Sequence, residues 1–277
     1  MRLDVLICTL NEGIADVPQI FLAPREDVTY VVSMQYTDEA YLDRIPDEIR
    51  HRDDVRLVLL EGKGLSRNRN NALKATTGDL ALIADDDVRY CNEYFDNIFK
   101  VFRENEKVDI AQLRIAASDH RAVSERYPAY PCTYPRVARG LYVSSIEMVL
   151  RVATVKNRVW FDERFGLGSP HYICGEESVF VHDAVQAGLT VTYFPYDVVE
   201  HNRRGTGANV FTDERVMMAK GAVQYYIHGW SGYLRMLKFA LVSAAKGQCS
   251  FGKLLCGTFK GINYYRKVVQ YENPIGR

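Results

Sequence analysis

Three consecutive aspartates, Asp85, Asp86 and Asp87, are the residues in this sequence best suited to hold a divalent cation. They follow an apolar run at residues 80–84, and adjacent carboxylates repel one another unless a cation or solvent screens them. Alternate residues of an extended chain point the same way, so Asp85 and Asp87 converge on one side. Hard carboxylate oxygens suit Mg²⁺ or Mn²⁺, which complete their shells with phosphate oxygens. The triplet by itself indicates either a cation site or a solvated acidic turn.

The elements around the triplet are those of an α/β protein. Short continuous apolar runs predict strands covered on both faces, at residues 5–8, 28–32, 55–60 and 80–84, and further strands are expected at 110–115 and 190–194. Helical spacing predicts helices over residues 65–76, 92–105 and 176–187, and the chain is helical from about residue 212. Alternating strands and helices predict a mostly parallel, Rossmann-like sheet flanked by helices. Ligands of such sheets bind beyond the carboxyl ends of the strands, where the triplet and residues 9–12 lie.

Four segments resemble the family 2 glycosyltransferases, whose fold is the nucleotide-diphosphosugar transferase type called GT-A. They read LICTLNE at residues 6–12, GLSRNRNNA at 64–72, GDLALIADDD at 78–87, and FDERFG to GEE at 161–177, followed by Glu200-His201. Their order and spacing are similar to the family over about residues 3–203, the type that bacteria use to build surface polysaccharides. The resemblance implies a GT-A catalytic domain at residues 1–207 and a basic, amphipathic helical extension at 208–277.

The resemblance also assigns roles to individual residues. It implies that the nucleotide-sugar donor is bound by Thr9, Leu10, Asn11, Glu12, Ser66, Arg69, Asp85 and Asp86. It implies that Mn²⁺ or Mg²⁺ is held by Asp87, Asp85 and His201, although a capping or core histidine is an equal alternative at position 201. Glu177 is expected to be the catalytic base, with Glu176 as acceptor ligand or substitute base. Arg203 and Arg204 are expected to neutralise the diphosphate, or to form an ordinary basic linker.

The implied reaction is an inverting transfer of a hexose or N-acetylhexosamine from a UDP-sugar to a glycan or lipid-linked saccharide. Two departures from the family bear on it. The family often has paired aspartates after its second strand, where this chain reads VSMQ at residues 32–35, so uracil specificity is less fixed than the fold. The family's usual Glu-Asp is here Glu176-Glu177, which shifts the reach of the base by about one methylene.

Two other functions fit parts of the sequence. A phosphohydrolase of the haloacid dehalogenase type also has an apolar strand followed by Asp-any-Asp, and Asp85 would be its nucleophile. Arg89 occupies the place where that motif continues with Thr or Val, which argues against this alternative. A non-catalytic module that binds nucleotide sugar is the third candidate, favoured only by the Glu177 departure.

Charge is unevenly distributed along the chain. Residues 203–277 hold 12 lysines and arginines against 3 aspartates and glutamates, whereas residues 1–202 hold 23 against 32. The basic end interleaves aromatic and aliphatic residues with cations, which indicates contact with an anionic membrane surface or, equally, packing on the main domain or on a second copy as a homodimer. No nucleic-acid partner is expected. No signal peptide and no membrane span are predicted, so we expect a cytoplasmic protein, peripheral at the inner face of the cell membrane.

Overall fold

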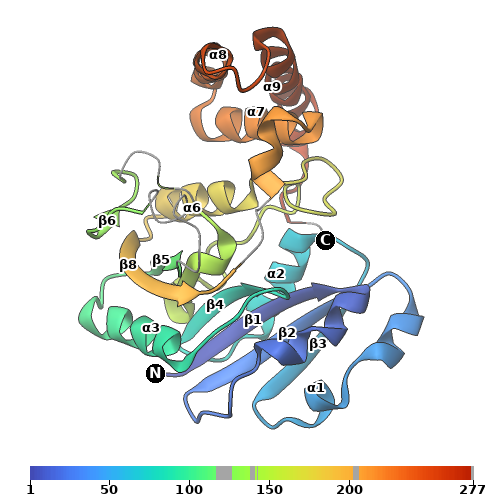
Figure 1. Ribbon diagram of the computed structural model, residues 1–277, viewed down its shortest axis with the longest axis vertical. Helices are drawn as coiled ribbons and strands as arrows, with labels where there is room; N and C mark the ends of the chain where they lie inside the picture. Colours follow the sequence, from blue (N-terminus) through green and yellow to red (C-terminus); the bar gives the residue numbers. More distant parts are fainter. Residues whose placement is uncertain (117–126, 138–140, 142, 202–205, 276–277) are drawn as a thin grey trace. The chain divides into compact units, whose positions relative to one another are not determined.

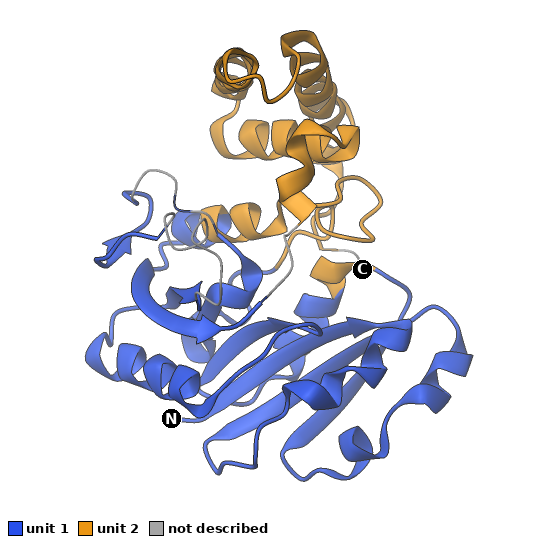
Figure 2. Ribbon diagram, in the orientation of Figure 1, with its two compact units in different colours: residues 1–63, 68–160, 183–202 blue, residues 64–67, 161–182, 203–277 orange. Residues whose placement is uncertain are grey.

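The computed structural model describes residues 1–116, 127–137, 141, 143–201 and 206–275. Spatial contacts divide the chain into two compact units, drawn in different colours in Figure 2. The first, which we call the strand unit, comprises residues 1–63, 68–160 and 183–202, and the second, the helical unit, comprises residues 64–67, 161–182 and 203–277. The sequence predicted a catalytic domain at 1–207 and an extension at 208–277, which are continuous segments and do not coincide with these two units. That domain boundary stays a prediction.

The strand unit is built on one eight-stranded sheet in the order β3-β2-β1-β4-β7-β5-β8-β6. Figure 1 shows β3, β2, β1 and β4 side by side in this sheet. The strands are β1 Leu3–Leu10, β2 Val28–Tyr36, β3 Val55–Glu61, β4 Leu80–Asp85, β5 Ile110–Ile115, β6 Cys132–Thr133, β7 Met148–Arg151 and β8 Val191–Val199. The β1–β2, β2–β3, β1–β4 and β5–β8 pairs are parallel, and β6 and β7 run antiparallel to their neighbours. The prediction of a mostly parallel sheet with flanking helices is confirmed.

The α-helices include all those expected from the sequence. They are α1 Asp47–His51, α2 Leu65–Ala75, α3 Asn92–Glu104, α5 Val152–Val155, α6 Glu176–Gln186, α7 Glu214–His228, α8 Ser231–Ala245 and α9 Phe251–Lys267. Short 3-10 helices lie at Asn11–Ala15, Val17–Ile20, Glu39–Arg44, Ser145–Glu147, Thr206–Phe211 and Val269–Tyr271.

The main core lies on the face of the sheet that α3 covers. Phe95, Ile98 and Phe102 of α3 are fully buried in one cluster with alternate residues of β1, β2 and β4. The period of α3 fits this burial, because residues three or four apart share one helical face. The edge strand β3 differs from its prediction, because Leu59 is 45% exposed and the strand is not covered on both faces. An edge strand has one neighbour only, and its burial is correspondingly partial.

Two polar side chains tie the other face of the sheet to α2 and to the turn that follows it. Asp4, buried in β1, accepts hydrogen bonds from Thr76 Oγ1 at 2.6 Å and from the Thr77 and Gly78 amides at 2.7 and 2.9 Å. Asn68 donates from Nδ2 to the carbonyls of Thr9 and Ser33, at 3.0 Å each. The bonds to Asp4 satisfy a buried charge near the start of β1, and those from Asn68 hold the carboxyl ends of β1 and β2 against α2.

The helical unit is held by close backbone packing and one buried ion pair. A side chain at Gly221 of α7 or at Gly261 of α9 would collide with backbone of the facing helix, so the two helices pack at glycine contacts. Arg164, paired with Asp162 at 2.6 Å, also donates to the backbone carbonyls of Val269 and Glu272 at 2.8 and 3.1 Å. The C-terminal segment is thereby fastened to residues 162–164. None of the helices in the described part of the chain has the length and apolar character that a membrane crossing requires.

Candidate active site

The aspartate triplet lies where strand topology predicted it, at the carboxyl end of β4. Asp85 is the last residue of β4 and is paired in register with Cys8 of β1, which places the triplet beside the residues that end β1. The three carboxylates are held differently, and each one is fixed by a separate side chain of the strand unit.

Asp86 is the most enclosed of the three carboxylates. Its Oδ2 accepts a hydrogen bond from Thr9 Oγ1 at 2.6 Å. A Cβ at Gly13 would come within 2.5 Å of the same Oδ2 and 2.6 Å of Thr9 Oγ1, so only glycine leaves room for this contact. Burial, opposed by the bond from Thr9 and reinforced by Asp85 and Asp87, raises the pKa of Asp86. Thr9, predicted to touch the donor, has a buried hydroxyl that orients the triplet.

Asp85 is neutralised by a buried arginine. Arg69 of α2 is 1% exposed and donates from Nη2 to Asp85 Oδ1 at 3.0 Å and to Ser145 Oγ at 2.7 Å. The Asp85 side chain keeps 32% of its surface exposed. A single guanidinium nitrogen bridges Asp85 and Ser145 and so holds this carboxylate in place, while part of the Asp85 side chain faces solvent.

Asp87 pairs with His201, a residue more than a hundred positions away. His201 Nε2 lies 3.3 Å from Asp87 Oδ1, and the two side chains are 13% and 27% exposed. The pairing depends on a backbone bridge in which Arg89 and Glu200 exchange hydrogen bonds of 3.0 and 2.9 Å. The bridge holds the chain after the triplet against the end of β8 and so makes His201 a neighbour of Asp87.

The residues after β1 form an exposed turn. Asn11 has a positive φ of 52°, and its Oδ1 accepts from the Thr37 amide at 2.9 Å, which ties the end of β1 to the segment after β2. Leu10 is 42% exposed and Glu12 is exposed. Asparagine tolerates this left-handed conformation better than most residues. Leu10 and Glu12 are therefore accessible to a ligand, while Asn11 shapes the turn.

The remaining described candidates belong to the helical unit. Ser66 is buried, and its Oγ donates to the Phe165 carbonyl at 2.6 Å, so its hydroxyl is occupied within the protein. Glu176 and Glu177 are the first two residues of α6, where the helix dipole stabilises negative charge. Glu176 is 4% exposed and Glu177 is half-buried. Of the two, Glu177 is the more accessible to an acceptor. Arg203 and Arg204 lie outside the described residues.

The described residues could supply some, but not all, of the oxygen ligands that a Mg²⁺ or Mn²⁺ ion needs. Within the described ranges, no group of three or more His, Cys, Asp and Glu is preassembled as a metal site. Two aspartates with exposed oxygen surface, Asp85 and Asp87, nevertheless match the one or two protein carboxylates by which Mg²⁺ is usually held when substrate phosphates supply further ligands. The arrangement suits a cation that arrives together with a diphosphate.

Several residues that shape the site were not singled out from the sequence. Gly13, Asn68, Ser145 and Cys8 all lie within one contact of the triplet or of its partners. Burial raises the pKa of the Cys8 thiol to about 12, which makes it inert packing and not a nucleophile. Gly13, two residues after Asn11 in the turn that follows β1, had a usable signal, because glycine after a strand often marks close backbone approach. The sequence held no signal for Ser145, because only the fold brings this residue to Arg69.

Comparison with known proteins is consistent with this geometry. The model of the family described as Glycosyl transferase family 2 matches residues 4–160. No curated protein matches the chain. The structure of S. aureus TarS 1-349 in complex with UDP-GlcNAc is similar, with a TM-score of 0.53, 16% sequence identity, and coverage of 96% of this chain and 92% of that one. The same TarS fragment alone gives a TM-score of 0.54 at 17% identity.

A longer TarS structure gives a TM-score of 0.55 at 15% identity, and this chain spans 55% of its length. At these identities the likeness shows the fold alone. The predicted GT-A fold, with helices at the C-terminus, is confirmed.

Proposed function

The chain belongs to glycosyl transferase family 2 and is a glycosyltransferase, and from this premise we propose that it uses a divalent cation to transfer a hexose or N-acetylhexosamine, with inversion, from a UDP-sugar to a glycan or lipid-linked saccharide. The observation that carries the proposal is the triplet at the end of β4, with Asp85 fixed by Arg69, Asp86 by Thr9 and Asp87 by His201. Family membership excludes the phosphohydrolase and the silent binding module as alternatives. Asp85, paired with a buried arginine, is also poorly placed to be an aspartyl nucleophile.

A uridine diphosphate donor is supported by the likeness to TarS, which was crystallised with UDP-GlcNAc and with UDP. The family's paired aspartates are absent from residues 32–35, which the structure places within β2. Ser33 there donates to Asn68 Oδ1 at 2.6 Å, and its hydroxyl serves the packing of α2. Recognition of the base therefore falls to the exposed turn that includes Leu10 and Glu12, and uracil is the expected base.

The divalent cation, Mn²⁺ or Mg²⁺, would be held by Asp87 and Asp85, with His201 as the neighbouring group. When bound, the cation supplies positive charge to the diphosphate as the bond to the sugar breaks. Arg69 orients the carboxylate of Asp85, and the Thr9 hydroxyl orients that of Asp86. A rigid set of carboxylates needs little rearrangement when charge develops on the leaving group, which is the condition for effective electrostatic stabilisation.

Glu177 is the proposed general base. The acceptor hydroxyl oxygen forms a bond to the anomeric carbon while the bond from that carbon to the diphosphate oxygen breaks, and the hydroxyl proton passes to a carboxylate oxygen of Glu177. The nucleotide leaves as UDP with the bonding electron pair. General-base catalysis of this kind contributes a factor of about 10²–10⁴ to the rate. Glu176, almost fully buried beside it, would position Glu177 or the acceptor.

The test is release of UDP from a panel of UDP- and GDP-sugars, with Mn²⁺, Mg²⁺ or EDTA, and with oligosaccharide or lipid-linked acceptors. We expect metal-dependent release of UDP from one UDP-sugar, in proportion to the amount of glycosylated acceptor formed. Equal release in EDTA and in Mn²⁺ would contradict the role of the cation, and turnover of GDP-sugars alone would contradict the choice of nucleotide.

A further inference from the structure

Helix α8 of the helical unit distributes its side chains against the usual rule for a helix of a globular protein. The residues that it buries are mostly small, namely Gly232, Met236, Ala240 and Ser243. The residues that it and its N-terminal cap leave exposed include large apolar ones, namely Trp230 at 67%, Leu234 at 70%, Leu241 at 54% and Val242 at 45%. Scattered apolar residues on a surface are normal, but several on one helix form a patch that a partner would cover.

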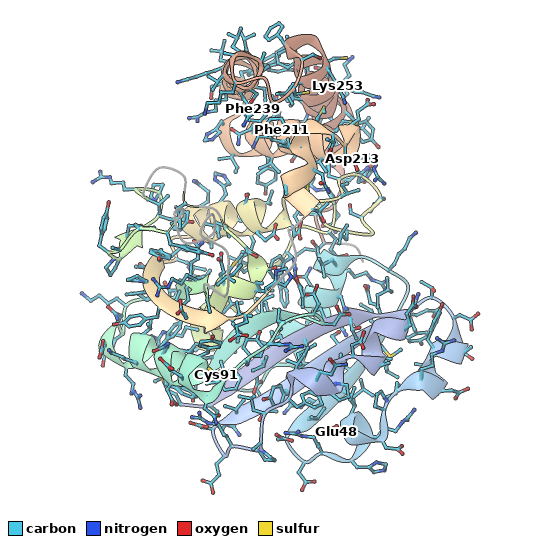
Figure 3. The ribbon with its side chains drawn as sticks, viewed as in Figure 1. Glu48, Cys91, Phe211, Asp213, Phe239 and Lys253 are labelled. Carbon is cyan, nitrogen blue, oxygen red and sulfur yellow. The ribbon has the colours of Figure 1, made fainter. Side chains whose placement is uncertain are left out.

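The exposed residues share one face of α8. At 3.6 residues per turn, Leu234, Lys238, Leu241 and Ala245 follow one another along a single stripe, with Trp230 one turn before it. Arg235, Lys238 and Lys246 are exposed on the same side of the helix. By contrast, the Phe239 ring stacks at 6.0 Å on Phe211 of the 3-10 helix Thr206–Phe211 (Figure 3), and Lys220 Nζ of α7 lies 4.7 Å from its centroid. We call the exposed residues 230, 234, 235, 238, 241, 242 and 246 the α8 face.

Trp230 is held in place although it is exposed. Its ring stacks on Tyr233 at a centroid distance of 5.6 Å and meets the edge of Tyr225 at 6.2 Å. The guanidinium of Arg266 lies 4.8 Å from the ring centroid. An indole fixed in this way is preorganised for contact, since little side-chain entropy is lost when a partner binds. Tryptophan is also the residue most enriched, with tyrosine, at membrane–water interfaces.

The positive charge around the α8 face indicates which kind of partner would bind there. Residues 216–271 contain 8 lysines and arginines and no aspartate or glutamate. Lys260 pairs with Glu214, which precedes this segment, at 2.7 Å. Two copies of the α8 face would bring like charges together, which disfavours a symmetric dimer. The exposed leucines and valine of the α8 face cannot form hydrogen bonds or ion pairs with a phosphodiester backbone, which disfavours a nucleic-acid partner. Apolar residues with interspersed cations match a surface that is apolar inside and anionic outside.

We propose that the α8 face docks on an anionic lipid bilayer, with Trp230, Leu234 and Leu241 in the acyl–headgroup boundary and Arg235, Lys238 and Lys246 on the headgroup phosphates. A helix that lies in the plane of a membrane binds through its buried apolar area together with attraction to anionic lipid. The docking is independent of the transfer reaction. If the acceptor of the proposed function is lipid-linked, the same surface would bring the enzyme to its substrate.

The test is co-sedimentation of the full chain with vesicles of phosphatidylcholine alone and of phosphatidylcholine and phosphatidylglycerol in equal amounts. We expect binding to the anionic vesicles only, and weaker binding as salt is raised, because headgroup attraction is screened. The double variant Leu234→Gln, Leu241→Gln should bind at least about tenfold more weakly, because two leucines lose their apolar contact. Arg235→Gln and Lys238→Gln should each weaken binding about fivefold.

Leu59→Gln is the matched control, because Leu59 of β3 is an exposed leucine outside the helical unit, and it should bind as the native chain does. Thermal unfolding and light scattering of each variant check folding and oligomeric state. Native-like vesicle binding by the double leucine variant would overturn the proposal. A dimeric native chain that the same variant converts to monomer would overturn it too and would assign the α8 face to a second copy. Asp87→Asn should bind vesicles normally, which separates this proposal from the proposed function.

Discussion

The strand unit pairs its buried charged groups, whereas the C-terminal helices expose an excess of cations beside large apolar side chains. In the strand unit, buried charged groups are matched, as Asp4 is by three donors and Arg69 by Asp85 and Ser145. In residues 216–271, the cations have no carboxylate within their own segment, and large apolar side chains face outward. Matched burial fixes groups for chemistry, whereas exposed apolar surface with unbalanced charge suits association. A substitution at a fixed, buried group is therefore expected to cost more than the same substitution at an exposed position.

Glu177→Gln is expected to lower kcat by a factor of about 10²–10⁴ with little change in the KM for the donor, because the amide cannot accept the acceptor proton. Glu214→Gln is the control, since Glu214 also lies in the first turn of a helix of the helical unit but makes a solvent-exposed ion pair with Lys260. Steady-state kinetics of UDP release measures both. A native kcat in Glu177→Gln, with loss in Glu176→Gln, would move the base to the neighbouring residue.

Arg69→Met is expected to lower the free energy of unfolding by about 2–3 kcal/mol. Breaking a buried ion pair costs about 3–5 kcal/mol, and the partial exposure of Asp85 reduces this figure. Arg235→Met, on the exposed face of α8, should change stability by less than about 0.5 kcal/mol. Urea unfolding of the two variants makes the comparison, and equal destabilisation would show that the buried pair is not a stabilising feature of the strand unit.

Gly13→Ala is expected to cost about 1–3 kcal/mol of stability, because the added methyl must displace Asp86 Oδ2 or Thr9 Oγ1. We expect UDP affinity to fall as well, since Asp86 and its neighbours lose their positions. Gly252→Ala in α9 meets nothing within 4 Å and should stabilise by about 0.5 kcal/mol. Thermal unfolding and UDP titration test the pair. Retention of native UDP affinity by Gly13→Ala would separate the turn after β1 from donor binding.

One group in each unit is expected to make stability rise with pH, in separate pH ranges and with the smallest effects of the series. The guanidinium of Arg52 lowers the pKa of Asp54 below its unfolded value of 3.8, so the stability from this pair is present above pH 3.8 and is lost as the pH falls through the folded pKa. Burial lowers the pKa of Lys220 below 10.5, so stability rises with pH between the folded pKa and 10.5.

Asp54→Asn should remove the acid-side loss, and Lys220→Met should remove the alkaline rise. Unfolding temperatures measured across pH test both. A native pH profile in either variant would assign the dependence to other groups.

The sequence predicted most of the fold because its signals were local. Continuous apolar runs identified β1, β2 and β4, and the spacing of Phe95, Ile98 and Phe102 identified α3. Strand β7 was missed because Met148–Arg151 is four residues long and is inserted antiparallel between β4 and β5, a pairing that depends on distant chain. The exposure of β3 was missed because an apolar run does not reveal whether its strand lies at an edge.

The candidate site was likewise predicted only where its signals were local in the sequence. The Asp85–Asp87 triplet and the turn after β1 were visible as polar residues following apolar runs. Arg69 was expected in the site, but its contact with Asp85 and the contributions of Ser145 and Gly13 were not visible, because they depend on the packing of α2 and the 3-10 helices. The Arg89–Glu200 bridge, which the sequence did not reveal, brings His201 to 3.3 Å from Asp87, and its role at the cation stays a prediction.

The most direct test of the central claim is calorimetric titration of UDP into the native chain, Asp87→Asn and Asp53→Asn, in Mn²⁺ and in EDTA. Asp53 is an exposed carboxylate outside the triplet and serves as the control. Mn²⁺ is expected to raise UDP affinity by about 5–150-fold in the native chain and in Asp53→Asn, the usual range for coupled ligands, and to have no effect in Asp87→Asn. The same gain with Mn²⁺ in Asp87→Asn would contradict the assignment of the triplet as the cation and diphosphate site.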